Sequence, residues 1–326
     1  MTVAVVALFG AVHLAWGEAG DAVSGPMAYR DRLYDVAYAD ANVAVAIGYP
    51  GKIFRSEDGG TTWSEVAVDT AEPLFSIDFV DGNTGWIVGR SGLIFRTDDG
   101  GKTWTKQISN TDGHLFAVDF LNKEKGIAVG NFGLILRTAD GGVTWTESSL
   151  EPMISASMYD VQIIDENIVY LAGEYPTWEA QLEEDVEAST LSSIFKSPDG
   201  GETWERVKIP SENHMFALSF SDEMTGYIAG TKGVLMETKD GGETWTSIDT
   251  EIPYHINDIF RSDDGSLMMA GNAGVLARLF DEKVTRIPND AFYWLTAVAM
   301  NNAGRGVAVG NHGLIMITRD GGKTWR

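Results

Sequence analysis

The stretch VGRSGLIFRTDDGGKTW, residues 88–104, returns along the chain in seven complete or eroded copies. The first glycines of the seven copies are Gly48, Gly89, Gly130, Gly173, Gly230, Gly271 and Gly310. By subtraction, successive glycines are 41, 41, 43, 57, 41 and 39 residues apart. A period near 40 residues is typical of β-propellers, in which each repeat forms one blade. The repeat therefore predicts an all-β fold, a seven-bladed propeller of four-stranded antiparallel blades.

Four strand signals follow one another in each repeat. In the second copy they cover residues 74–80, 85–88, 93–97 and 104–108. The first of them alternates between apolar and other residues, as a half-buried strand does. Its equivalents are residues 33–39, 115–121, 158–164, 215–221, 256–262 and 295–301. We expect this first strand to line the central channel, with its small or polar positions facing the lumen.

Two kinds of turn punctuate the repeat. The turn between the second and third strands has the form G-x-x-G, and its glycines permit the positive φ angles of a tight turn. The turn between the third and fourth strands has the form S/T-x-D-G-G-x-T-W. We predict that its Asp accepts N–H groups of its own turn and that its Trp folds into the blade. The six Asp–Trp pairs are Asp58 and Trp63, Asp99 and Trp104, Asp140 and Trp145, Asp199 and Trp204, Asp240 and Trp245, and Asp320 and Trp325.

This octapeptide is the Asp box, or BNR repeat, which occurs in sialidases, in some seven-bladed glucan hydrolases and in the photosystem II stability/assembly factor family. Seven repeats with V-G-x-x-G-x-I before the box are most similar to that last family, over residues 33–325. The resemblance implies an exported propeller that assists the assembly or stability of a membrane-protein complex and is not an enzyme. The structural role predicted for the boxes agrees, because six equivalent carboxylates around a rim cannot converge on one substrate.

Three departures from the repeat modify this expectation. Repeat six replaces its box by LFDEKVTR, residues 279–286, with Arg286 at the Trp position, and we expect it to be the weakest blade. Repeat four carries an insertion, residues 176–190, predicted to form a short amphipathic helix over the G-x-x-G turns. Photosynthetic members carry an arginine patch, and only Arg90 fits one here. A photosystem and another envelope complex, such as a transporter, therefore both stay open as partners.

Composition narrows the class further. The chain has 326 residues, with 47 acidic and 24 basic side chains and a net charge of -23, which argues against nucleic acid as a partner. It has no cysteine, which excludes disulfides, thiolate metal sites and a lipid anchor on an N-terminal cysteine. We expect no cofactor, no bound metal and a monomer.

The ends of the chain carry two further expectations. Residues 1–17 contain no charged side chain and predict a signal peptide, which leaves residues 18–326 as one propeller in the periplasm or another exported compartment. The alternative is an uncharged apolar tail without an export role. Residues 20–29 precede the first inner strand, and we expect them to complete the outer strand of the last blade.

The candidate partner-binding face is the one that carries the G-x-x-G turns and the loops entering the inner strands, since the other face is committed to the boxes. It gathers polar and aromatic residues typical of an interface. They are Arg90, His114, Phe132, Tyr175, Trp178, His214, Tyr254, His255, Tyr293, Trp294 and His312. A metal site formed by the four histidines is the alternative to polar loop residues, and their separation on different blades favours the latter.

The inner strands carry five acidic residues that are further candidates. Asp35, Asp160 and Asp258 lie at one level, and Asp78 and Asp119 lie two residues further along. They predict an acidic lumen that holds a hydrated cation, or else carboxylates solvated in a wet pore.

A sialidase-like glycan-binding or glycoside-hydrolysing propeller is the alternative function, but no arginine triad for a substrate carboxylate is apparent.

Overall fold

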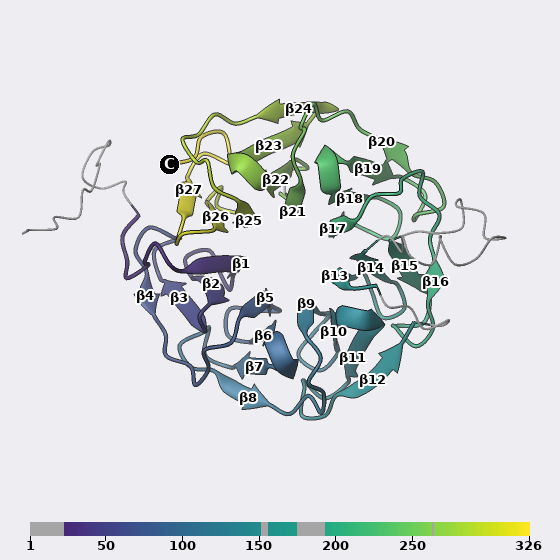
Figure 1. Ribbon diagram of the computed structural model, residues 1–326, viewed down its shortest axis with the longest axis horizontal. Coiled ribbons are helices and arrows are strands. Elements are labelled where there is room, and N and C mark those ends of the chain that lie inside the picture. Colours follow the sequence, from purple (N-terminus) through teal and green to yellow (C-terminus); the bar gives the residue numbers. More distant parts are fainter. Residues whose placement is uncertain (1–22, 151–155, 175–192, 263) are drawn as a thin grey trace, which may run out of the picture.

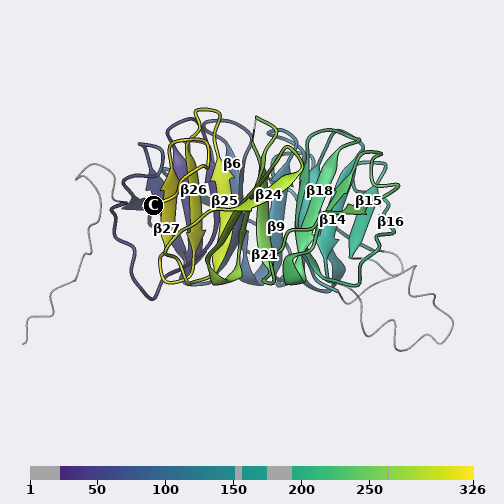
Figure 2. The same cartoon turned by 90° about the horizontal axis from the view of Figure 1, so that it is seen from above.

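Seven antiparallel sheets surround a central axis in the computed structural model, and the chain passes through them in sequence order (Figure 1). The structure describes residues 23–150, 156–174, 193–262 and 264–326. Seen from the side, the ring is a flat disc with the strands running between its two faces (Figure 2). Six sheets of the described chain have four strands and one has three, which confirms the predicted seven-bladed all-β propeller. The predicted signal peptide and the insertion at residues 176–190 lie outside the described residues.

Each blade places its first strand at the channel and its later strands progressively outward. The inner strands are β1 (Arg32–Tyr38), β5 (Leu74–Phe79), β9 (Leu115–Phe120), β13 (Met158–Ile163), β17 (Met215–Phe220), β21 (Ile256–Arg261) and β25 (Leu295–Met300). The second strands are β2 (Ala44–Tyr49), β6 (Gly85–Gly89), β10 (Gly126–Gly130), β14 (Val169–Gly173), β18 (Gly226–Gly230), β22 (Leu267–Gly271) and β26 (Gly306–Gly310). These inner strands agree with the predicted ones to within one residue at either end.

The third strands are β3 (Lys52–Ser56), β7 (Ile94–Thr97), β11 (Leu134–Thr138), β15 (Ile194–Ser197), β19 (Leu235–Thr238), β23 (Val275–Phe280) and β27 (Ile315–Thr318). The short outer strands are β4 (Ser64–Glu65), β8 (Thr105–Gln107), β12 (Thr146–Ser149), β16 (Glu205–Arg206), β20 (Thr246–Ser247) and β24 (Lys283–Arg286). Four G-x-x-G turns form single 3-10 turns, η1 (Arg90–Gly92), η2 (Asn131–Gly133), η4 (Thr231–Gly233) and η5 (Asn272–Gly274). No helix in the described ranges has the length and apolar character to cross a membrane.

The apolar core lies between the blades rather than within any one of them. The cluster between blades one and two joins Val45, Ile47 and Ile53 of the first blade to Leu74 and Ile77 of the second. The second strands are buried on both faces, as in β6, where every residue is buried. A single four-stranded sheet cannot cover both of its own faces, so each blade depends on its neighbours for its core.

The two glycines of the G-x-x-G turn have different roles. In η1, Gly92 adopts a left-handed φ of 67°, as the tight turn requires. Gly89 is extended, and a Cβ there would lie 2.4 Å from the carbonyl oxygen of Pro73, in the loop that enters the inner strand of the same blade. The prediction that both glycines serve positive φ angles is therefore right for the second glycine only. The first glycine allows the incoming loop to approach the turn.

The S/T-x-D-G-G-x-T-W turns have the hydrogen bonds predicted for them. In blade two the Asp99 carboxylate accepts the backbone N–H groups of Lys102 and Thr103, at 3.0 and 2.9 Å, and the Thr103 hydroxyl at 2.6 Å. Gly101 donates its N–H to the hydroxyl of Thr97, the first residue of the turn. The same Asp acceptor with its Thr donors recurs at Asp58, Asp140, Asp199, Asp240 and Asp320.

Blade six replaces the box by a shorter hairpin. Strands β23 and β24 are joined by Asp281 and Glu282, both with left-handed φ angles, and four residue pairs form the ladder. Arg286 pairs with Ala277, as Ser247 pairs with Met236 in blade five. The prediction that Arg286 takes the Trp position is wrong, because the hairpin is two residues shorter and the register moves. A regular ladder between β23 and β24 thus takes the place of the missing box. That blade six is the weakest blade stays a prediction.

The ring closes between blades seven and one, and the described residues of the N-terminal segment do not complete the outer strand of blade seven as expected. Ser24 exchanges backbone hydrogen bonds with Thr61 and Trp63 in the box of blade one, rather than pairing with β27. The outer position of blade seven is held by Arg326, which exchanges two hydrogen bonds with Ile317. Among the described residues of the N-terminal segment, Val23 and Met27 pack into the core between these two blades. The described part of the segment, from Val23 on, therefore seals the seam and does not form the fourth strand of blade seven.

Removing residues 23–28 should lower the melting temperature by several degrees, because the seam loses the side chains of Val23 and Met27 together with the bonds of Ser24. Burial of two such apolar side chains contributes about 2–4 kcal/mol, since both are only partly buried. Thermal unfolding followed by circular dichroism measures the change. The double change Val23→Ala and Met27→Ala should account for most of it, and unchanged melting of both variants would contradict this role of the segment.

Candidate functional site

One face of the disc carries the G-x-x-G turns and the loops that enter the inner strands, and we call it the G-x-x-G face. The opposite face carries the boxes, and we call it the Asp-box face. The strand order places the described candidates on the G-x-x-G face: Arg90, His114, Phe132, His214, Tyr254, His255, Tyr293, Trp294 and His312. Tyr175 and Trp178 lie outside the described residues. That these residues bind a partner stays a prediction.

Two of the histidines hold the loops of this face in place. The Nδ1 atom of His114 accepts the backbone N–H of Ser91, and that of His255 accepts the backbone N–H of Lys232. In both cases the donor is the left-handed residue of the preceding blade's G-x-x-G turn. The described residues include no group of three or more His, Cys, Asp or Glu placed to hold a metal ion. The arrangement supports a structural role for these two histidines rather than a shared metal site.

An aromatic cluster with strongly exposed rings lies on this face at blades seven and one. The ring of His312 stacks on Tyr29 with centroids 4.2 Å apart, and Tyr293 packs edge-on against both. Phe292 and Trp294 in the same loop are 86% and 55% exposed. We call Tyr29, Phe292, Tyr293, Trp294 and His312 the rim cluster. Tyr29 and Phe292 were not among the sequence candidates, although the run Phe292-Tyr293-Trp294 marks the site.

The remaining candidates stand apart from this cluster. Phe132 is 70% exposed at the tip of the blade-three turn, and Tyr254 is 44% exposed in the loop that enters blade six. The Arg90 guanidinium lies 3.6 Å from the carboxylate of Glu72, and both side chains are about half exposed. A surface ion pair of this kind contributes little to stability, so Arg90 keeps its charge available at the surface.

An arc of five aromatic rings follows the inner strands just below the G-x-x-G face. Neighbouring ring centroids are 5.5, 5.4, 5.9 and 5.4 Å apart. The members come from blades one to five, each one residue after the residue that pairs with the first glycine of the G-x-x-G turn: Tyr34, Phe75, Phe116, Tyr159 and Phe216. We call them the aromatic arc. Sequence analysis missed it, although an aromatic residue after the first buried Leu or Met of an inner strand was visible in five repeats.

The acidic residues of the inner strands connect neighbouring blades. The Asp35 carboxylate of blade one accepts the backbone N–H of Ile77 in blade two at 2.9 Å. The Asp78 and Asp119 carboxylates accept from Phe120 and Ile163 of the next blades. Asp160 accepts from Leu218 and Asp258 from Val298. These bonds give the carboxyls a structural role between blades, while a hydrated cation in the lumen stays a prediction.

Their position inside the ring changes their acidity. All five side chains are only partly accessible to solvent. Burial raises the pKa of Asp35 to about 7, and the charge of Asp258 adds to the rise. Burial likewise raises the pKa of Asp119 and Asp258 to about 6, and it raises the pKa values of Asp78 and Asp160 well above the ordinary range.

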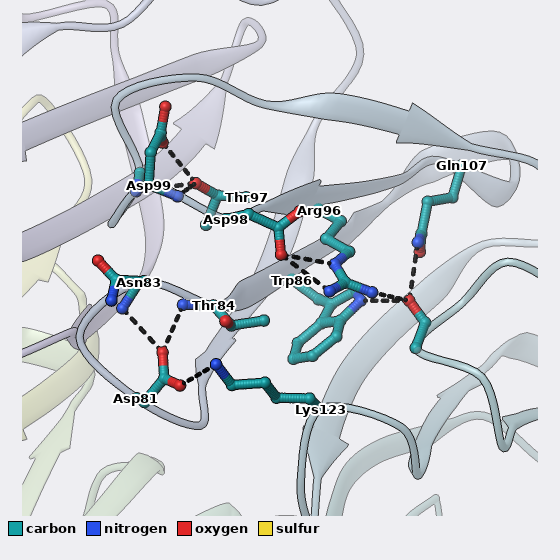
Figure 3. Close-up of polar contacts among 12 residues, drawn as sticks. Asp81, Asn83, Thr84, Trp86, Arg96, Thr97, Asp98, Asp99, Gln107 and Lys123 are labelled. Atoms are coloured by element: carbon teal, nitrogen blue, oxygen red, sulfur yellow. Dashed lines mark hydrogen bonds and ion pairs between the residues drawn. The ribbon is translucent and has the colours of Figure 1, made fainter.

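The Asp-box face is occupied by a second set of bonds between blades. The carbonyl oxygen of Gly141, in the blade-three box, accepts hydrogen bonds from Trp86, Arg96 and Gln107 of blade two (Figure 3). The Trp86 ring also stacks on Phe120 of blade three at 3.5 Å. In blade five the equivalent carbonyl of Gly241 accepts from Tyr170 and Lys196 of blade four, and Gly100 in blade two accepts from Arg55.

The seam between blades three and four shows what happens without this contact. Ile127 stands where blade two has Trp86 and blade four has Tyr170, counted from the start of the second strand. Arg137 donates to the Glu202 carboxylate at 3.3 Å. A cavity of about 290 Å³ lies here, lined in part by Ile127, Arg137 and Glu202. The smaller side chain therefore leaves space that a large ring fills elsewhere.

Comparison with known proteins places the chain in a family. The model described as photosynthesis system II assembly factor YCF48 matches residues 22–107, 62–201 and 196–279, which together span most of the chain. The chain belongs to the YCF48 family. This confirms the resemblance drawn from the repeats. None of the curated proteins matches the sequence.

Solved structures show the same fold at low identity. A structure of YCF48 bound to D1 peptide is 18% identical with a TM-score of 0.72, covering 94% of this chain and 98% of that one. YCF48 from Cyanidioschyzon merolae is 20% identical with a TM-score of 0.70, covering 90% of this chain and 97% of that one. A GH74 xyloglucanase from Xanthomonas campestris is 14% identical with a TM-score of 0.70, covering 92% of this chain but 55% of that one.

The channel carboxyls should make the YCF48-family propeller more stable at mildly acidic pH than at neutral pH. Their pKa values rise from 3.8 in the unfolded chain to about 6–7. Between these values the folded state binds more protons, so the free energy of unfolding falls as pH rises from about 4 to about 7. We expect Asp35→Asn to flatten this slope in calorimetric melting curves.

Asp199→Asn is the matched control for that experiment. Hydrogen bonds from Thr203 lower the pKa of Asp199 to about 2, so its contribution is present above 3.8 and is lost as pH falls towards 2. The control should change the stability without changing the slope between about pH 4 and 7. Parallel profiles for the native chain and Asp35→Asn would show that Asp35 does not titrate in this range.

Proposed function

We propose that this protein is a non-enzymatic assembly or stability factor that holds a segment of a membrane-protein complex on its G-x-x-G face. The observation that carries the proposal is the distribution of exposed aromatic residues. Of the eleven large hydrophobic residues exposed in the described chain, seven are aromatic residues on this face: Tyr29, Tyr49, Phe132, Tyr254, Phe292, Tyr293 and Trp294. Exposed aromatic residues beside polar groups are typical of protein interfaces.

The nature of the partner follows from family and charge. A structure of YCF48, a member of the same family, holds a D1 peptide, which supports a polypeptide segment as the ligand here. The net charge of -23 favours a basic segment, because charge complementarity speeds encounter and disfavours acidic partners. A photosystem subunit and an envelope component such as a transporter both fit this description. We place the protein in an exported compartment on the strength of residues 1–17.

Catalysis is not part of the proposal because the candidate acids already have structural partners. The box carboxylates are held by N–H and hydroxyl groups of their own turns, and the channel carboxyls by backbone N–H groups of the next blade. A glycosidase needs two carboxyl groups free to face one sugar. The xyloglucanase similarity covers only 55% of that enzyme, so it supports a shared propeller and not a shared reaction.

A photo-crosslinking amino acid at Trp294 should form adducts with an integral membrane protein in the native membrane, whereas one at Lys323 on the Asp-box face should not. Mass spectrometry of the adducts identifies the partner. The double variant Phe292→Ala and Trp294→Ala should then weaken capture of that protein by about tenfold or more, because both rings are largely exposed and lie in an aromatic cluster.

Lys102→Glu with Lys323→Glu is the matched control, since both lysines are exposed on the opposite face. This pair should leave capture unchanged, and thermal melting should show that all variants are folded. Adducts from Lys323 alone, or loss of capture in the lysine pair alone, would assign binding to the Asp-box face.

A further inference from the structure

We propose that the channel mouth on the G-x-x-G face is a binding site for a Lys or Arg side chain of an extended partner segment, received by the aromatic arc. This deepens the proposed function, because it names the chemistry that the face recognises. It does not depend on which membrane protein supplies the segment.

The first argument is the backbone position of the arc. Every inner strand has a register shift directly after the residue that pairs with the first glycine of the G-x-x-G turn, as between Leu33 and Asp35 in β1 or between Leu74 and Ser76 in β5. The skipped residue of a β-bulge has no place in the ladder, and the bulge re-aims its side chain. In five consecutive blades this residue is aromatic and half-buried, and none of the five belongs to the described apolar clusters between blades. The rings therefore line the mouth rather than fill the core.

The second argument is the charge directly beyond the rings. Asp35 follows Tyr34 and Asp160 follows Tyr159 in the chain, while Asp78 and Asp119 lie three residues beyond Phe75 and Phe116. The hydrogen bonds to these carboxyls come from neutral backbone N–H groups. A cation at the mouth would lie next to the rings, and it would favour the ionised form of carboxyl groups whose like charges otherwise repel one another.

A bare metal ion fits the mouth less well than an organic cation does. Metal ions require several oxygen ligands converging at short distances, and the described residues hold no such group. An ammonium or guanidinium group instead binds over aromatic rings within about 6 Å and needs no converging carboxylates. The five rings supply such a surface over most of the circumference.

The arc also has an opening that suits a chain entering from the rim. In blades six and seven the bulged residues are Asn257 and Thr296, which donate to the carbonyl oxygens of Leu295 and Leu33. Trp294 of the rim cluster lies two residues before Thr296. An extended segment could place apolar residues on the rim cluster and pass over this polar gap, with its cationic side chain in the mouth.

Selection of short random peptides displayed on phage tests the site on the full chain. Enriched peptides should carry Lys or Arg beside apolar or aromatic residues. The best peptide, synthesised with a fluorophore, should bind about tenfold more weakly to the variant Phe75→Leu with Phe116→Leu, in which two rings are lost but apolar volume is kept. The control Phe280→Leu removes an exposed ring from the Asp-box face and should bind like the native chain.

Replacement of the peptide's Lys or Arg by norleucine or Glu should abolish binding, and added salt should weaken it. Enrichment of acidic or uncharged peptides, or equal binding to the arc variant and the native chain, would overturn the inference. The capture experiment separates the two proposals. If Phe292→Ala with Trp294→Ala loses the membrane protein while the arc variant keeps it, the face binds a partner and the mouth does not.

Discussion

The contact between neighbouring blades is the constraint on which the rest of this structure depends. A blade is too small to bury both of its faces, so each second strand is covered by the blades on either side. The seam has three layers. Carboxyl groups bond to backbone N–H groups on the channel side, apolar side chains fill the middle, and side chains of one blade reach the box carbonyl of the next on the Asp-box side. Closing the ring gives every blade a neighbour on both faces and leaves only short outer strands as sheet edges.

The box therefore acts beyond its own hairpin. Its Asp fixes the turn, and the fixed turn presents a glycine carbonyl at a constant place on the blade surface. A neighbouring Arg, Lys, Tyr or Trp can reach that carbonyl because the repeat sets the spacing, as Arg55 and Lys196 show. This agrees with the similarity of the six boxes along the chain, whereas the central residues of the G-x-x-G turns differ from repeat to repeat. Where the reaching side chain is reduced, as at Ile127, the seam contains a cavity.

The period of the sequence was enough to predict the number of blades and all seven inner strands, because the repeat and its alternation are properties of consecutive residues. The bonds between blades were not predicted, although their spacing follows the same period. Asp35 and Ile77 are 42 residues apart and Asp119 and Ile163 are 44 apart, in each case one residue more than the step between their glycines. The sequence could not show whether those carboxyls face water or the next strand, because this depends on the pleat and the bulge. Arg286 was misplaced for a similar reason, since a hairpin two residues shorter leaves the overall repeat length almost unchanged.

The bulge at the start of each inner strand explains how one ring can be rigid and still carry a specific site. The ladder on either side of the bulge fixes the backbone, so the skipped residue is held in place without contributing to pairing. Blade three has Phe116 at this position and blade seven has Thr296. The lining of the mouth therefore differs between blades, while the sheet that supports it has the same register. Two residues that bond to the next blade, Asp35 and Asp160, are the immediate neighbours in sequence of the ring residues Tyr34 and Tyr159. Strain or motion is not needed to present the rings, because the same closed ring that buries the core also aims these side chains at the mouth.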